Sequence, residues 1–191
     1  WFWRSVGASQ NAFALESFID ELAHAAGTCP WHFRRPLLTG RPELIRVLDA
    51  AAERAGWQMD LPVGRGHGIA LVEDFGSICA QVADVEVSRS GAVTVKRIVT
   101  AFDCGNAVNP QTIEHQVQSS ILYGLSATLW SKVQIQDGRA RHGNFDHHRV
   151  MKMADAPQMD THLVLSGGDK WGGVGEPGLP AVAPAVCNAI F

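Results

Sequence analysis

The sequence is poor in charged side chains. Asp, Glu, Lys and Arg make up 18% of the 191 residues, below the usual share of about 25%. The formal net charge is −3, so no excess of positive charge would attract nucleic acid or an anionic membrane surface. A low charge fraction together with six tryptophans indicates that other parts of a longer polypeptide, or partner subunits, cover much of the surface. No nucleic-acid partner is expected.

Cysteine is scarce and widely spaced. The four cysteines, Cys29, Cys79, Cys104 and Cys187, form no Cys-x-x-Cys pair, which argues against a zinc knuckle and a dithiol redox motif. We expect free and largely buried thiols, although pairing stays open. The spacing of these cysteines also does not match that of the cysteine ligands of an iron–sulfur cluster.

Long apolar runs, internal repeats and low-complexity tracts are absent. No stretch has the length of a transmembrane helix or the form of a signal peptide. The chain starts with Trp-Phe-Trp and ends inside an apolar run. We interpret it as a fragment, a processed chain or part of something longer.

Residues 1–60 form a mainly helical segment in our interpretation. The pattern predicts a helix from Ser9, as its N-cap, to about Ala26. Another helix follows Pro30, and a third runs over 42–55 and is closed by Gly56. The first helix is expected to bury one wide apolar face, made of Phe13, Leu15, Phe18, Ile19 and Leu22.

Residues 61–191 contain strands, a long helix and a glycine-rich loop. Alternating apolar residues and turn signals predict strands over 69–72, 80–87, 93–102 and 159–165. Helices are expected over 111–130, with Ile113, Val117, Ile121, Leu122 and Leu125 buried, and over 180–191. Helices followed by strands, a helix, strands and a helix indicate an α+β fold.

The glycine-rich loop reads Gly-Gly-Val-Gly-Glu-Pro-Gly-Leu-Pro over 172–180. Four glycines and two prolines in nine residues exclude a helix or strand interior. The expected result is a rigid loop that presents the carboxylate of Glu176. Two interpretations stay open on the local pattern: a presented catalytic group, or a solvated charge near the start of the next helix.

Other polar elements carry weaker signals. The segment Arg4-Ser-Val-Gly, the loop over 103–110 and the amide of Gln116 could converge with the glycine-rich loop on a bound cofactor. The cluster Gly-Arg-Gly-His-Gly at 64–68 precedes a strand, which is the wrong order for a dinucleotide fingerprint. Close packing of strands explains that cluster better.

Three histidines cluster near an aspartate. His142, His147 and His148 with Asp146 are potential metal ligands, which leaves a zinc-dependent hydrolase as a weak alternative. However, adjacent residues in an extended segment point to opposite faces, so two neighbours cannot easily share one metal.

The polar motifs occur in a distinctive order: Arg4-Ser-Val-Gly-Ala-Ser-Gln, then Asp103-Cys-Gly with Asn-Pro at 109–110, then Gln116-Val, then Gly-Val-Gly-Glu-Pro over 173–177. In this order, the chain resembles the molybdenum hydroxylases, the xanthine dehydrogenase and aldehyde oxidase group. It is most similar to the large subunit of the isoquinoline 1-oxidoreductase and aldehyde dehydrogenase branch. The resemblance covers essentially the whole chain.

The resemblance implies a molybdenum-dependent hydroxylase. Members hydroxylate an aldehyde or an N-heteroaromatic carbon with oxygen from water, on a molybdenum centre held by molybdopterin, which in most bacterial members is the cytosine dinucleotide form. Glu176 matches the general base that removes a proton from the Mo–OH group. The implied cofactor contacts are Arg4, Gln116, Gly172, Gly175, Asn109 and Thr112.

The resemblance also implies partners. Electrons would pass to a small subunit with two [2Fe–2S] clusters and then to a cytochrome or another acceptor. The family's Gly-Gln-Gly and Gly-Gly-Phe-Gly-Gly loops are missing, so residues 1–191 are interpreted as the C-terminal part of a molybdopterin-binding large subunit. A non-catalytic structural or assembly module of the same fold is the alternative. The compartment stays open between the bacterial cytoplasm and periplasm.

Two positions depart from the family pattern. Val6 stands where many relatives have an aromatic residue that packs on the substrate ring, which argues against a flat purine-type substrate and leaves aldehydes or smaller heterocycles. His148 stands where a tyrosine is usual.

Overall fold

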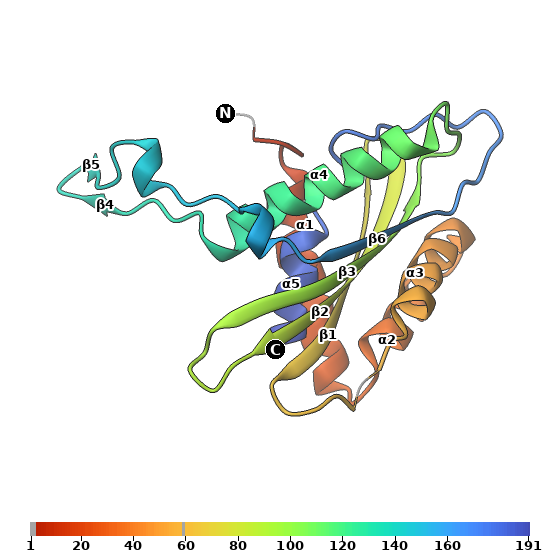
Figure 1. Cartoon of the computed structure of the whole chain (residues 1–191). Coiled ribbons are helices and arrows are strands. Elements are labelled where there is room, and N and C mark those ends of the chain that lie inside the picture. The colour runs from red at the N-terminus through yellow and green to blue at the C-terminus, as the bar shows by residue number, and fades with distance from the viewer. Residues whose placement is uncertain (1–2, 59) are drawn as a thin grey trace.

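The computed structural model describes residues 3–58 and 60–191, so Trp1, Phe2 and Met59 lie outside the described residues. A four-stranded sheet of order β1-β2-β3-β6 forms its centre (Figure 1). Strands β1 (Arg65–Asp74), β2 (Ser77–Val87) and β3 (Val93–Asp103) form an antiparallel meander, and β6 (Gln158–Leu163) pairs parallel to β3. The α+β prediction is confirmed.

Helices cover both faces of the sheet and create two apolar cores. Helix α3 (Pro42–Ala55) packs on β2 and β3, and helix α5 (Val182–Ile190) packs on β1 and β2 with its own set of buried residues. Helix α1 (Ala8–Ala25) and helix α4 (Pro110–Leu129) lie against α5. Helix α2 (Pro30–Leu37) contacts α1 and α3. None of the described helices is both long and apolar enough to cross a membrane.

The glycines of β1 allow α5 to approach the sheet closely. A Cβ atom on Gly66 would lie 2.0 Å from the carbonyl oxygen of Ala189, and one on Gly68 would lie 2.1 Å from that of Ala185. Any larger side chain would push the helix away from the strand. Close packing explains this glycine cluster, but the partner is a helix and not a strand, as the sequence had suggested.

The predicted buried face of α1 is wrong. The helix starts at Ala8 after Gly7, without a side-chain cap from Ser9. Its inner face carries Glu16 and Asp20, because Arg34 of α2 pairs with both carboxylates at 3.0 Å. The apolar side chains Phe13, Leu15, Phe18 and Leu22 are exposed instead, and Ile19 is half-buried.

Helix α4 matches its predicted range within one residue, and four of its five predicted core positions are buried. The exception is Leu122, which is half-buried. After α4 comes an irregular segment, residues 131–157, here named the arm. The arm contains the two-stranded ribbon of β4 (Ile135–Gln136) and β5 (Arg139–Ala140), and the short 3₁₀ turns η1 (Phe145–His147) and η2 (Met153–Asp155). Its β4–β5 and η1 part extends away from the sheet, and the residues around η2 return to α4 (Figure 1).

Candidate functional site

The predicted loop lies across the ends of β1, β2 and β3. We name residues 171–178 the Glu176 loop. The backbone N–H of Gly172 donates to the carbonyl of Cys104 at 2.8 Å, and that of Gly173 donates to the carbonyl of Phe75 at 2.8 Å. The hydroxyl of Ser77 donates to the carbonyl of Gly173 at 2.6 Å. The ends of the strands therefore provide the floor on which the loop rests.

Two glycines are required by close approach at this floor. A Cβ atom on Gly172 would lie 2.2 Å from the Ser77 hydroxyl oxygen and 2.5 Å from the carbonyl oxygen of Gly76. Gly105, which forms an isolated bridge with Trp171, has φ +83° and would place a Cβ 2.1 Å from the carbonyl oxygen of Lys170. Neither position has room for a side chain.

Asp103 fixes the end of β3 beneath the Glu176 loop. Its Oδ1 accepts from the backbone N–H of Gly105 at 2.7 Å and from the N–H and hydroxyl of Ser166 at 3.1 Å. Its Oδ2 accepts from Arg46 at 2.8 Å. Burial alone would raise the pKa of Asp103, but the N–H donors of Gly105 and Ser166 and the charge of Lys170 outweigh it, so its pKa lies below the ordinary value.

Arg4 connects the N-terminal segment to the Glu176 loop and to α4. Its Nε donates to the carbonyl of Gly175 at 2.9 Å, and Nη2 donates to the same oxygen. The other donors reach the hydroxyls of Ser119 at 3.2 Å and Ser120 at 2.8 Å. The guanidinium also lies 5.8 Å from the ring centre of Tyr123. The fork of Arg4 is thus occupied by acceptors of this chain.

Ser5 contacts the carboxylate of Glu176 directly. Its backbone N–H donates to Oε1 at 2.9 Å. Ser5 has φ +75° and is fully buried, and Val6, which is 38% exposed, has φ +43°. Left-handed φ values are unusual for residues with a Cβ atom and indicate a backbone held by its surroundings. Ser9 is the second residue of α1 and therefore not its N-cap, and its hydroxyl makes a short contact with that of Ser5.

Glu176 is half-buried and keeps free hydrogen-bonding capacity. Among residues 3–58 and 60–191, no donor pairs with its Oε2. In the same part of the chain, no acceptor pairs with the backbone N–H groups of Val174, Gly175 and Glu176. Asp74, at the end of β1, has a raised pKa because of burial and the negative charge of Glu176. The loop therefore presents one carboxylate oxygen and several N–H donors.

The structure brings four predicted site residues together: Arg4, Gln116, Gly175 and Glu176. Both the carbonyl and the side-chain oxygen of Gln116 lie 3.5 Å from Arg4 Nη2, and Gly172 supports the loop from below. Asn109 and Thr112 lie one turn or more before Gln116. The side chain of Asn109 caps α4 by accepting from the Thr112 N–H at 3.1 Å.

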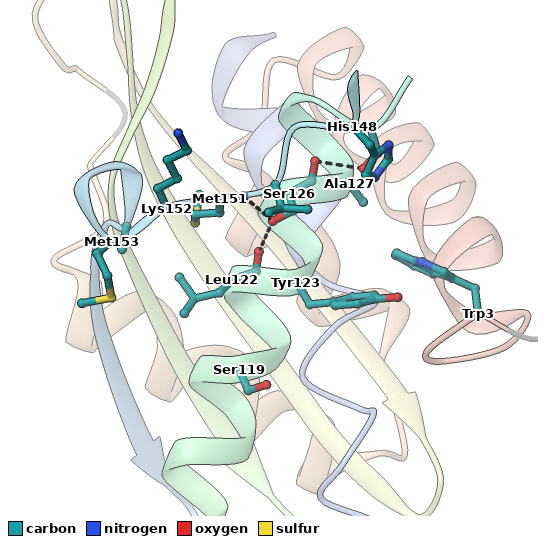
Figure 2. A pocket seen from close by; sticks show the side chains of 13 residues that line it. Trp3, Ser119, Leu122, Tyr123, Ser126, Ala127, His148, Met151, Lys152 and Met153 are labelled. Carbon is teal, nitrogen blue, oxygen red and sulfur yellow. Dashed lines mark hydrogen bonds between the residues drawn. The ribbon is translucent and has the colours of Figure 1, made fainter. Parts of the chain in front are cut away.

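A pocket of about 520 Å³ lies between Trp3, α4 and the C-terminal half of the arm (Figure 2). The ring centres of Trp3 and Tyr123 are 5.2 Å apart at its wall, and Leu122, Met151 and Met153 add apolar surface. Glu176 does not line this pocket.

The histidine cluster does not support the zinc alternative. Within the described ranges 3–58 and 60–191, no three His, Cys, Asp or Glu side chains come close enough to hold a metal ion. His142, His147 and His148 are all in the arm, where His142 is half-buried and the other two are exposed.

The prediction of free thiols is confirmed. All four cysteines are free, and Cys79 and Cys104 are buried. Burial raises the pKa of Cys79 to about 12, so this thiol remains protonated and unreactive at neutral pH.

Sequence reasoning missed several residues of the site. Ser119 and Ser120 follow Gln116 by three and four residues, so helical spacing could have placed them on its face. Phe75, whose carbonyl supports Gly173, and Ser5, whose N–H contacts Glu176, act through their backbone. No side-chain pattern in a sequence reports a backbone contact of this kind.

Comparisons with known proteins identify the family of the chain. Residues 50–157 match the family described as molybdopterin cofactor-binding domain. The chain is 31% identical to the beta chain of the isoquinoline 1-oxidoreductase of Brevundimonas diminuta and 33% identical to a chain of the nicotinate dehydrogenase of Pseudomonas putida, with 98% of this chain covered in each case. It spans only 24% and 17% of the length of these two relatives.

The fold recurs in solved structures. An aldehyde oxidoreductase from Desulfovibrio desulfuricans covers 100% of this chain with a TM-score of 0.78 and 14% identity, over 39% of its own length. An aldehyde oxidoreductase from Desulfovibrio gigas gives a TM-score of 0.76 and 15% identity, covering 98% of this chain and 39% of its own. With residues 50–157 matching the family, the chain belongs to the molybdopterin cofactor-binding domains of the molybdenum hydroxylase enzymes.

Proposed function

We propose that this chain is part of the catalytic subunit of an oxidoreductase that hydroxylates an aldehyde or an N-heteroaromatic carbon with oxygen from water, and that Glu176 is its general base. One observation carries this proposal: the carboxylate is fixed at Oε1 by the Ser5 N–H at 2.9 Å, while no donor within the described residues occupies Oε2. A fixed carboxylate with one free oxygen is suited to accept a proton in a defined direction.

The residues around Glu176 fit a molybdopterin cofactor. Such a cofactor offers many hydrogen-bond acceptors, and the loop offers backbone N–H donors at Val174 and Gly175 that lack acceptors among the described residues. A Cβ atom on Gly175 would meet nothing within 4 Å, so a group can approach the backbone there. The residues proposed to hold the cofactor, in its cytosine dinucleotide form, are Gln116, Gly172, Gly175, Asn109 and Thr112. The resemblance also implies a cofactor contact for Arg4, but its guanidinium nitrogens bond to Gly175, Ser119 and Ser120.

The bound cofactor would supply the two-electron redox chemistry. The protein's part is to hold and move one proton. Glu176 Oε2 would accept it from the water-derived oxygen nucleophile as the C–O bond forms, while Oε1 stays bonded to Ser5 N–H. The C–H bond of the substrate carbon breaks in the same reaction, and that hydrogen would leave with its electron pair to the bound cofactor. A positioned base of this kind contributes about 10²- to 10⁴-fold in rate.

The proposed partners follow from this reaction. The remainder of the large subunit would complete the walls of the site, since the chain spans 24% or less of the two relatives described above. A small subunit with [2Fe–2S] clusters would take the electrons and pass them to a cytochrome or another acceptor. The substrate is a small molecule, and the aliphatic, partly exposed Val6 favours aldehydes and small heterocycles over flat purines.

The experiment is the Glu176→Gln variant in the assembled enzyme that contains this chain. Glutamine keeps the size and can still accept from the Ser5 N–H, but it cannot take up a proton. We expect kcat to fall by about 10²- to 10⁴-fold while molybdenum and pterin contents stay at the wild-type level. Unchanged turnover would exclude the general-base role.

Metal analysis of the native complex separates catalysis from the structural alternative. A catalytic subunit should carry molybdenum and pterin in stoichiometric amounts. A native complex that contains this chain and neither of the two would identify it as a structural or assembly module.

A further inference from the structure

We propose that Arg4 is a positioning residue that acts through Glu176 and not through the cofactor or the substrate. This inference rests on the proposed function of Glu176 and adds a second residue to it. Arg4 touches the carbonyl of Gly175, the residue directly before the base, with two of its nitrogens. The next residue, Ser5, touches the base itself.

Each of the three guanidinium nitrogens of Arg4 has at least one acceptor in this chain. Its Nε and Nη2 reach the Gly175 carbonyl, Nη2 also reaches Ser120, and Nη1 reaches Ser119. A planar fork with acceptors of this chain on its edges fixes distance and angle together. Arg4 thus joins α4 to the Glu176 loop as one unit.

The same segment directs the carboxylate. Ser5 has a left-handed backbone, with φ +75°, and its N–H points at Glu176 Oε1 at 2.9 Å. This conformation is unfavourable for a residue with a Cβ atom unless neighbouring contacts stabilise it. The bonds of Arg4, one residue earlier, supply such contacts. Without Arg4, the Gly175 carbonyl should lose its donors, and the Ser5 N–H should no longer be held towards Glu176 Oε1.

The test uses Arg4→Ala and Arg4→Lys in the assembled enzyme. A misplaced base slows the chemical step and leaves substrate binding alone, so Arg4→Ala should lower kcat about 100-fold with KM within about twofold. Lysine can donate to the Gly175 carbonyl but cannot reproduce the fork, so Arg4→Lys should be intermediate. Added guanidinium ion at millimolar concentration should restore part of the kcat of Arg4→Ala.

A double-mutant cycle tests whether Arg4 affects kcat through Glu176. If Arg4 acts through Glu176, the double variant Arg4→Ala with Glu176→Gln should be no slower than Glu176→Gln alone, and guanidinium should not rescue it. Multiplied losses in the double variant would overturn the proposal. A fall in kcat for Glu176→Gln with no effect of Arg4→Ala would remove this inference only, whereas normal turnover of Glu176→Gln would remove the proposed function.

Hydrogen exchange gives a readout that is independent of turnover. In Arg4→Ala, the hydrogen-bonded amides of Ser5, Gly172 and Gly173 should exchange faster than in the wild type, with molybdenum content unchanged. The matched control is Arg65→Ala, because Arg65 also pairs with an acceptor of this chain, Asp84, but at the opposite end of β1. It should change neither kcat nor exchange in the Glu176 loop. Unchanged exchange in Arg4→Ala would contradict the proposal.

Discussion

The Glu176 loop and the arm both lack long regular elements, yet they differ in what holds them. The Glu176 loop bonds to the turn after β1, the end of β3 and the N-terminal segment. The arm bonds largely to itself and has few ties to the body, such as Met151 N–H to the Ser126 hydroxyl at 3.0 Å. An irregular backbone is therefore rigid where distant segments supply partners for its N–H and carbonyl groups.

The largest difference in stability between the two regions is expected when a glycine in each is replaced by alanine. Gly172→Ala places a Cβ against the Ser77 hydroxyl and the Gly76 carbonyl, so the backbone must shift, and we expect a loss of about 3 kcal/mol in the free energy of unfolding. The control in the arm is Gly143→Ala, where a Cβ meets nothing within 4 Å. Urea denaturation of both variants checks this. Similar losses would show that the two regions are held alike.

Replacing Asp103, which fixes the end of β3 beneath the Glu176 loop, should change the free energy of unfolding in a pH-dependent way. Asp103→Asn weakens a buried acceptor of several hydrogen bonds, and we expect a loss of about 2 kcal/mol at pH 7. Because the folded-state pKa of Asp103 is lowered, its ionised form stabilises the fold above the ordinary aspartate pKa of about 3.9, and this stability is lost as the pH falls through the folded-state pKa. Denaturation from pH 7 to pH 3 should show the variant and wild type converging. A constant difference would contradict the assignment.

Asp74 should behave in the opposite way. Burial and the charge of Glu176 raise its pKa, and its Oδ2 is buried without a partner among residues 3–58 and 60–191. The ionised form therefore destabilises the fold at neutral pH. Asp74→Asn should stabilise the protein by about 1 kcal/mol at pH 7.

The gain from Asp74→Asn should shrink as the pH falls towards about 3.9, because the wild-type carboxyl then becomes neutral as well. Thermal melting across this pH range measures it. A destabilised Asp74→Asn at pH 7 would show that the charge of Asp74 supports the loop floor.

The smallest effect is expected at the tip of the arm. Phe145 is 91% exposed, so Phe145→Ala removes no buried contact, and the free energy of unfolding should change by less than about 0.5 kcal/mol. Urea denaturation of the protein checks this. A loss comparable to that of Gly172→Ala would mean that the arm is as tightly held as the Glu176 loop.

The sequence predicted elements where local chemistry decides them. Helix α3 begins at Pro42 and ends before Gly56, whose φ is +66°, because a proline at the first helical position and a left-handed glycine after the last one are local signals. The irregular loop around Glu176 was predicted for the same reason, since four glycines and two prolines permit nothing else.

The order of the motifs suggested that Arg4 and Gln116 meet the Glu176 loop, but the atoms that make contacts between distant segments could not be predicted. The inward face of α1 depends on Arg34, which belongs to another helix and neutralises Glu16 and Asp20. The left-handed backbone of Ser5 depends on groups more than a hundred residues away. Hydrophobic periodicity shows which side chains share one face of a helix, but it does not show which element packs against that face.

The contact between Ser5 and Glu176 has a consequence in time. The two residues are 171 positions apart, so at about 5–20 residues per second a ribosome makes the second one roughly 9–34 s after the first. During that interval Arg4 lacks the Gly175 carbonyl as its acceptor, and no contact with Glu176 stabilises the left-handed backbone of Ser5. The order of synthesis therefore makes this site one of the last parts of the domain to form, after the sheet that supports it is available.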